Sequence, residues 1–129
     1  MNTSPNSESL LYGDITEKIL EAAFEVSKEL GFGFLESVYR NAMVIAMRAK
    51  SLKVEIEKPI SVIFRGQSVG QFYADLFVDD KVIVELKAVS ALAPEHSAQT
   101  INYLKATGIE VGLLINFGRP KIEYKRLHK

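Results

Sequence analysis

Two acidic side chains and a lysine stand at the ends of one short segment, DLFVDDKVIVELK, residues 75–87. Glu85 and Lys87 are two residues apart on a predicted strand, so they project from the same face of an otherwise apolar stretch. Burying either charge alone is costly, and burying both demands good geometry or a metal ion. We therefore interpret this segment as the place where chemistry would occur.

The register of the predicted hairpin decides whether Asp75 joins this pair. A two-residue turn would set Asp75 opposite Val84 and send Glu85 to the other face, because a slip of one residue reverses every side chain. A three-residue loop, residues 79–81, sets Asp75 opposite Glu85. We predict this loop or an equivalent bulge; carboxylates on opposite faces would contradict a catalytic interpretation.

Two carboxylates beside a lysine suit a Mg²⁺-dependent phosphodiesterase. Mg²⁺ takes oxygen ligands and is commonly held by one or two carboxylates together with substrate phosphate, and it activates a bound water. Lys87 could orient or deprotonate that water and neutralise charge on the phosphorus. In the alternative interpretation, Asp75 is a surface residue and Glu85 forms a solvated pair with Lys87 at a sheet edge.

Helical periodicity governs the first part of the chain. We expect residues 1–10 to be disordered and residues 11–129 to form a single domain. An apolar stripe from Ile15 to Leu30 predicts a helix with Asp14 as its N-cap and a glycine end at Gly31. A second stripe predicts a helix from residue 35 to residue 49.

Strand periodicity follows from residue 53 onward. Three strands, about residues 54–64, 69–78 and 82–88, form a predicted antiparallel meander, with Pro59 indicating an edge strand or a bulge. A helix from Pro94 to about Lys105, closed by Gly108, precedes a buried strand over residues 111–117 and an edge strand over residues 122–127. The predicted class is α/β (α+β), with one mixed central sheet in the order ααβββαβ.

Composition limits the kind of metal site. The 129 residues include no cysteine and only two histidines, which excludes a disulfide framework, a thiol nucleophile and cysteine-ligated zinc. The 16 basic and 16 acidic side chains cancel, but residues 118–129 are strongly basic. With no apolar run long enough to span a bilayer, we expect a cytoplasmic protein without membrane contact.

The motif Asp75 … Glu85-Leu86-Lys87 resembles that of the PD-(D/E)xK nuclease superfamily, whose restriction-endonuclease-like core order αβββαβ matches the prediction from the second helix on. Gln99 and Tyr103 fit the QxxxY pattern of the RecB and lambda-exonuclease branch. Residues 33–39, GFLESVY, fit the GxxExxY pattern of a family of short, poorly characterised prokaryotic proteins. The resemblance covers about residues 12–127.

The resemblance implies a role for each matching residue. Asp75 and Glu85 would be metal ligands with the Leu86 backbone carbonyl, Lys87 the catalytic lysine, Glu36 a residue facing the metal site, and Gln99 and Tyr103 contacts to the lysine region or a substrate phosphate. Ala74 stands where the superfamily often has proline.

Several of these residues also have ordinary structural explanations. Glu36 comes early in a helix, where the macrodipole favours a carboxylate whatever its function. Tyr39 fits a core residue with a hydrogen-bonded hydroxyl, and His96 fits a surface residue at a helix start. The basic tail, comprising Arg119, Lys121, Lys125 and Arg126, could contact the nucleic-acid backbone or simply protect a closing edge strand from pairing.

The leading hypothesis is a nuclease that uses Mg²⁺ or Mn²⁺ to hydrolyse DNA, with RNA as the second candidate. We expect no sequence specificity of its own, and action instead on a structural feature, an end or a substrate presented by a protein partner; a homodimer would fit the size of the chain. A catalytically idle nucleic-acid- or protein-binding module is the alternative, and a metal-dependent hydrolase of small phosphate esters is the third.

Overall fold

Three helices and five strands make up the part of the chain that the structure, a computed structural model, describes, residues 10–129. Residues 1–9, most of the segment predicted to be disordered, lie outside the described residues. The elements are α1 (Gly13–Leu30), α2 (Glu36–Ala49), β1 (Val54–Phe64), β2 (Gln67–Val78), β3 (Val82–Lys87), α3 (Pro94–Thr107), β4 (Val111–Asn116) and β5 (Glu123–His128). The predicted order is confirmed, including the last edge strand.

The strands form one mixed sheet in the order β1-β2-β3-β4-β5. All neighbours pair antiparallel except β3 and β4, which are parallel and joined through α3. Pro59 lies on β1, an edge strand, and a bulge separates Val62 from Ile63. Both features agree with the prediction, because proline lacks the N–H that an interior strand needs.

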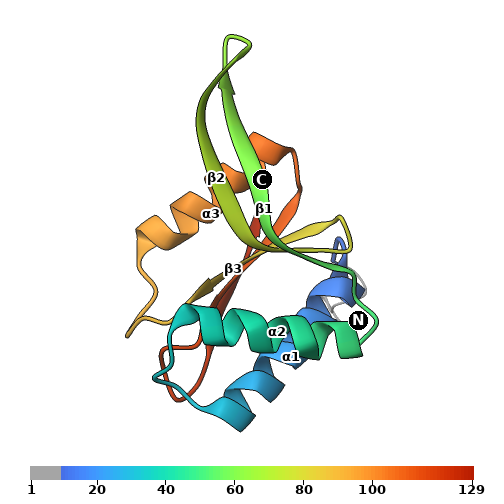
Figure 1. Ribbon diagram of the computed structural model, residues 1–129, viewed down its shortest axis with the longest axis vertical. Coiled ribbons are helices and arrows are strands. Elements are labelled where there is room, and N and C mark those ends of the chain that lie inside the picture. The colour runs from blue at the N-terminus through green and yellow to red at the C-terminus, as the bar shows by residue number, and fades with distance from the viewer. Residues whose placement is uncertain (1–9) are drawn as a thin grey trace, which may run out of the picture.

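Helices cover both faces of the sheet (Figure 1). Val84 and Leu86 of β3 pack with α1 and α2 in one core cluster, whereas Ile83 packs with Tyr103 and Leu104 of α3 in another. Alternate residues of β3 therefore enter different cores. Glu85 follows Ile83 onto the face that α3 covers. None of the described helices has the length and apolar character needed to cross a bilayer.

The turn between β2 and β3 fixes the register of the hairpin. Asp79 and Asp80 both adopt left-handed backbone conformations, with φ of 52° and 56°, and the Lys81 N–H donates to the Val78 carbonyl at 3.0 Å. Lys81 remains as an extra residue, so Val78 pairs with Val82. This is the predicted three-residue loop.

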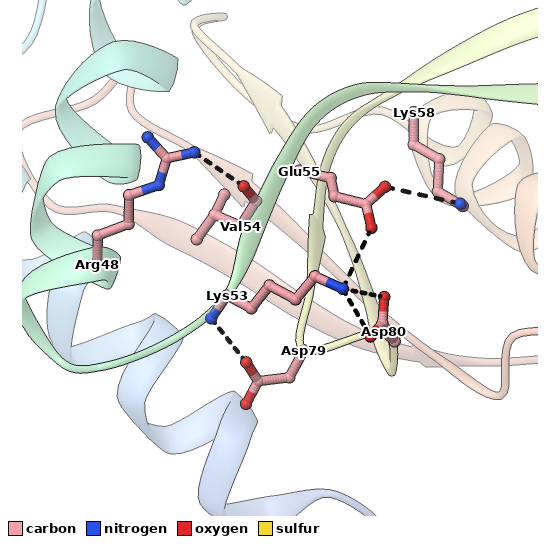
Figure 2. A network of polar contacts seen from close by, with 7 residues as sticks. All are labelled: Arg48, Lys53, Val54, Glu55, Lys58, Asp79 and Asp80. Atoms are coloured by element: carbon pink, nitrogen blue, oxygen red, sulfur yellow. Dashed lines mark hydrogen bonds and ion pairs between the residues drawn. The ribbon is translucent and has the colours of Figure 1, made fainter.

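A polar network fastens this turn to the start of β1 (Figure 2). The Lys53 N–H donates to Asp79 Oδ1 at 2.7 Å, and the Asp79 N–H donates back to the Lys53 carbonyl at 2.9 Å. Lys53 Nζ also bonds both carboxylate oxygens of Asp80, at 3.0 and 3.2 Å. The Asp79 and Asp80 carboxylates are therefore engaged with Lys53 at the turn and do not belong to the candidate site.

The start of α1 differs from the prediction. Asp14 was the expected N-cap, but Tyr12 occupies that position in a left-handed conformation, with no side-chain cap hydrogen bond. The Gly13 N–H donates to the Leu10 carbonyl at 2.9 Å. With this backbone turn before it, the helix begins two residues earlier than predicted, so Asp14 lies in the first turn, where its charge still interacts favourably with the helix dipole. The end at Gly31 is as predicted.

Candidate active site

Asp75 and Glu85 lie side by side, joined by reciprocal contacts between strands. The Leu86 N–H donates to Asp75 Oδ2 at 2.8 Å, and the Asp75 N–H donates to Glu85 Oε1 at 3.4 Å. The pairing of Leu76 with Val84 places Asp75 opposite Glu85 when it is continued by one residue. The predicted juxtaposition of the two carboxylates is confirmed.

The strand β2 bends away from β3 at Asp75, which is why both carboxylates can meet there. The paired part of the two strands ends at Leu76, and beyond it the Asp75 carboxylate takes the Leu86 N–H in place of a backbone partner. Leu76 packs in the core of α1 and α2, while Ala74 packs with α3. Alternation thus breaks at Asp75, and Glu57, opposite it on β1, has a positive φ of 52°.

Glu85 is a buried acid with an unfavourable environment for its charge. Its relative exposure is 5%. Burial foremost, followed by the charge of neighbouring Asp75, raises the pKa of Glu85 to about 9 from an ordinary value of 4.5, and Lys87 opposes this shift only in part. Two adjacent carboxyl groups with so little compensating positive charge nearby would attract a cation strongly.

Lys87 occupies the end of β3, half-buried, on the same side as Glu85. Its carbonyl accepts a hydrogen bond from the Phe117 N–H at 2.8 Å. The backbone groups of Lys87 therefore point toward β4, and those of Leu86 point the opposite way, toward Asp75. The Leu86 carbonyl consequently lies on the side where β2 no longer pairs with β3.

The helix α3 carries Tyr103 to this face and exposes Gln99 one turn before it. Tyr103 is buried beside Ile83 and Ala74. Burial raises the pKa of Tyr103 above its ordinary value, and the charges of Glu85 and Asp75 raise it further. Tyr103 is therefore close to the two carboxylates. Gln99 is exposed and shares a groove with Tyr103.

Glu36 does not join the carboxylate pair. It is the first residue of α2 and is exposed, and residues 10–129 contain no group of three or more acids or histidines placed to hold a metal. Tyr39, one turn further, is fully buried. Its hydroxyl donates to the Gly31 carbonyl at 2.8 Å, and its ring stacks on Phe117. The structural explanation of Tyr39 is confirmed.

His96 also has a structural role. Its Nδ1 accepts a hydrogen bond from the Ala93 N–H at 2.9 Å, and the backbone N–H of His96 donates to the Ala93 carbonyl at 3.0 Å. These bonds satisfy backbone groups at the start of α3. The ring is thereby engaged at the helix start, in agreement with the simpler interpretation of this histidine.

A buried polar clamp that the sequence interpretation missed holds the loop after Lys87. Asn116, fully buried, bonds both backbone groups of Val89, with its Oδ1 at 3.0 Å from the N–H and its Nδ2 at 2.9 Å from the carbonyl. Its Nδ2 also donates to Glu123, which accepts the Leu92 N–H. The clamp links the end of β3 to the start of α3. Its one sequence signal is a polar residue inside the apolar run VGLLINF.

The basic tail divides into engaged and open side chains. The Arg126 guanidinium donates to Thr16 Oγ1 at 3.1 Å and to the Leu11 carbonyl, so it ties β5 to α1. Arg119 forms an ion pair with Glu123 at 3.6 Å. Lys121 and Lys125 are exposed. These two lysines are the members of the predicted interface most available to a polyanion.

Comparisons with known proteins bear on the family and the fold of the chain. A family model described as the PD-(D/E)XK nuclease superfamily matches residues 13–127. The crystal structure of SSO0001 superimposes with a TM-score of 0.56 at 17% sequence identity, covering 73% of this chain and 50% of that one. The chain thus spans about half the length of that solved structure. That likeness supports a restriction-endonuclease-like fold. No curated protein matches the chain.

Proposed function

Since the chain belongs to the PD-(D/E)XK nuclease superfamily, we propose that it is a divalent-metal-dependent nuclease that hydrolyses phosphodiester bonds in DNA, with RNA as the second candidate substrate. The observation that carries the proposal is the contact of Asp75 with the Glu85–Leu86 segment at the point where β2 leaves β3. A nuclease of this kind needs two carboxylates at one point beside a lysine. The superfamily model spans residues 33–39 but does not identify the GxxExxY family, so membership of that family stays a prediction.

The donor set fits a hard divalent cation, Mg²⁺ or Mn²⁺. Asp75 and Glu85 would bind it through oxygen, and the Leu86 carbonyl, directed to the same side, is a third oxygen donor. A cation would also offset the burial and the repulsion by Asp75 that raise the pKa of Glu85. Bound there, it would polarise the substrate phosphate and activate a water molecule.

The protein groups around the pair would complete the chemistry. Lys87 projects beside Glu85, where its ammonium could position the attacking water and stabilise negative charge on the phosphorus. Tyr103, already close to both carboxylates, and Gln99 would hold a substrate phosphate or the Lys87 amine. Glu36, exposed at the start of α2, would act on the substrate or an outer water.

Lys121 and Lys125 would attract the nucleic-acid backbone from the C-terminal edge of the sheet. Arg119 would contribute after leaving Glu123, and Arg126 would serve mainly as a tether to α1. Sequence specificity would come from a second copy of the chain or from a protein partner.

A cleavage assay tests the proposal. Wild type, Asp75→Asn, Lys87→Ala and the control Asp14→Asn, which removes an exposed carboxylate on α1, are incubated with single-stranded, duplex and branched DNA and with RNA, in Mg²⁺, Mn²⁺ or EDTA. We expect cleavage by wild type and Asp14→Asn in metal alone, and at least a ~100-fold loss in the other two variants. Metal-dependent cleavage that persists in Asp75→Asn would contradict the assignment. Absence of cleavage on every substrate would favour an idle binding module.

A further inference from the structure

A groove opens beside the candidate site, between α3 and the β1–β2 hairpin. The hairpin extends well beyond the rest of the sheet, and α3 runs next to its base (Figure 1). The groove has a volume of about 750 Å³. Glu95 and Lys105, from the first and last turns of α3, line it together with residues of both elements.

The two walls have different chemistry. On the α3 wall, Gln99, Asn102 and Tyr103 lie at helical spacings of three and four, so they share one face. The hairpin wall is apolar and includes Val62, Ile63 and Phe72. Phe72 is 43% exposed. The centroids of the Phe72 and Tyr103 rings are 5.6 Å apart, and the ring planes make an angle of 42°. The groove thus combines an exposed aromatic face with two carboxamide groups.

Tyr103 links the groove to the surroundings of the carboxylate pair. It forms part of the groove's lining and belongs to the same core cluster as Ala74, the neighbour of Asp75 in the chain. A nucleic-acid strand whose phosphate reached Asp75 and Glu85 would therefore carry its adjacent base toward Phe72. The carboxamides of Gln99 and Asn102 each offer a donor and an acceptor, as the edge of a base requires.

We propose that this groove binds an unpaired nucleobase next to the phosphate that is cleaved, so that the substrate is single-stranded or has a frayed or flapped end. In an intact duplex the bases are stacked and paired, and their faces and Watson–Crick edges are not free to enter such a groove. The inference rests on the proposed function for the position of the phosphate. It extends that function by naming the substrate class.

A second copy of the chain is the competing occupant, because Ile63 and Phe64 near the hairpin tip are each 59% exposed. The residues that line the groove favour a nucleobase over a second chain as its occupant. A partner chain seated in the groove would cover Gln99 and Tyr103 and close the approach to the carboxylates. Its apolar side chains would also bury the Asn102 carboxamide without supplying its hydrogen bonds.

The test measures binding in EDTA, so it does not depend on cleavage. The probes are a single-stranded oligonucleotide that contains 2-aminopurine, whose fluorescence falls when the base is stacked, and a blunt duplex of the same sequence. We compare wild type with Phe72→Leu, which keeps apolar bulk but removes the aromatic ring, and with Asn102→Ala, which alters an exposed side chain. The control is Phe24→Leu on α1, where the phenylalanine is 49% exposed.

For the single strand, we expect affinity about tenfold weaker in Phe72→Leu and about threefold weaker in Asn102→Ala, with less quenching in both. Phe24→Leu should match wild type, and the duplex should bind equally to all four proteins. Equal affinity of Phe72→Leu and wild type for the single strand would overturn the inference. So would a dimer in sedimentation experiments that Phe72→Leu converts to a monomer without weakening DNA binding.

The two proposals fail separately. Base-dependent binding without cleavage in metal would support the groove and contradict the nuclease. Metal-dependent cleavage of the blunt duplex at the same rate in wild type and Phe72→Leu would support the nuclease and contradict the groove.

Discussion

Glu85 is a carboxylic acid whose surroundings oppose its ionisation. It is buried on the face covered by α3, next to a second carboxyl group, and its pKa rises to about 9 from 4.5. Between these two pH values the folded chain holds a proton that the unfolded chain has released. The contribution of Glu85 to stability is therefore greatest below pH ~4.5 and is lost as the pH rises toward 9.

Replacing Glu85 by glutamine should remove this pH dependence. Without metal, the unfolding free energy of wild type should fall by up to about 1.4 kcal/mol for each pH unit above the unfolded pKa, relative to Glu85→Gln. Glu85→Gln should be the more stable protein at pH 8, because its amide does not have to take up a proton on folding, whereas the Glu85 carboxylate of the unfolded wild type does. Urea unfolding in EDTA from pH 5 to pH 9 measures the difference. Parallel pH profiles for the two proteins would contradict the buried-acid interpretation, and Asp14→Asn should follow wild type.

At the scale of elements, the turn between β2 and β3 decides which residues meet. Asp79 holds a left-handed conformation and accepts the Lys53 N–H. Both features favour the register in which Val78 pairs with Val82. With the register shifted by one residue, Asp75 would face Val84 and the site would be lost.

Variants of Asp79 separate the conformational role from the hydrogen bond. Asp79→Gly keeps an easy left-handed residue but loses the bond, and it should cost about 1 kcal/mol of unfolding free energy. Asp79→Ala also loses the bond but keeps a β-carbon in that conformation without the polar side chain that makes aspartate tolerant of it, and it should cost about 2 kcal/mol or more. Asp79→Asn, which retains an acceptor, should be close to wild type. Thermal and urea unfolding give the order, and Asp79→Ala as stable as Asp79→Gly would show that the turn conformation is unimportant.

The loop between β3 and α3 depends on Asn116. Asn116→Ala would leave the Val89 backbone groups and the Gly118 N–H, all partners of the amide, without their bonds. We expect a loss of about 2 to 3 kcal/mol in unfolding free energy. Cleavage should fall as well, because the clamp positions the loop that leads from Lys87 to α3. Asn41→Ala, an exposed asparagine on α2, is the control; similar stability of the two variants would contradict the clamp.

Local sequence signals were sufficient for the element order, the loop of residues 79–81 and the common face of Glu85 and Lys87. Periodicity and turn length determine these features directly. The bend at Asp75, the Asn116 clamp and the Arg126 tether were not predictable, since they depend on contacts between distant segments. Asp14 was assigned as a cap because the backbone turn before it leaves no clear signal in residue types.

At the scale of the whole molecule, charge is distributed unevenly although the totals cancel. The last twelve residues carry a net positive charge, but their basic side chains have different roles. Lys121 and Lys125 are exposed to solvent, whereas Arg126 links β5 to α1. Electrostatic attraction to nucleic acid should therefore come from the lysines, and stability from the arginine.

Salt titrations separate these duties. Lys121→Ala and Lys125→Ala should each lower the slope of log affinity against log salt by about one unit for DNA, without changing the unfolding free energy much. Arg126→Ala should instead reduce stability and leave the slope nearly unchanged. Fluorescence anisotropy at several salt concentrations, with urea unfolding, tests both. A lower slope in Arg126→Ala than in Lys125→Ala would contradict this division.

Mn²⁺ titration followed by calorimetry tests the central claim, that Asp75 and Glu85 form one cation site, most directly. Wild type and the control Asp14→Asn should each release or absorb heat for one bound ion per chain. Asp75→Asn and Glu85→Gln should each lose that heat, because removal of either carboxylate leaves a single charged ligand. A wild-type heat that persists unchanged in Asp75→Asn would contradict a shared metal site at these two residues.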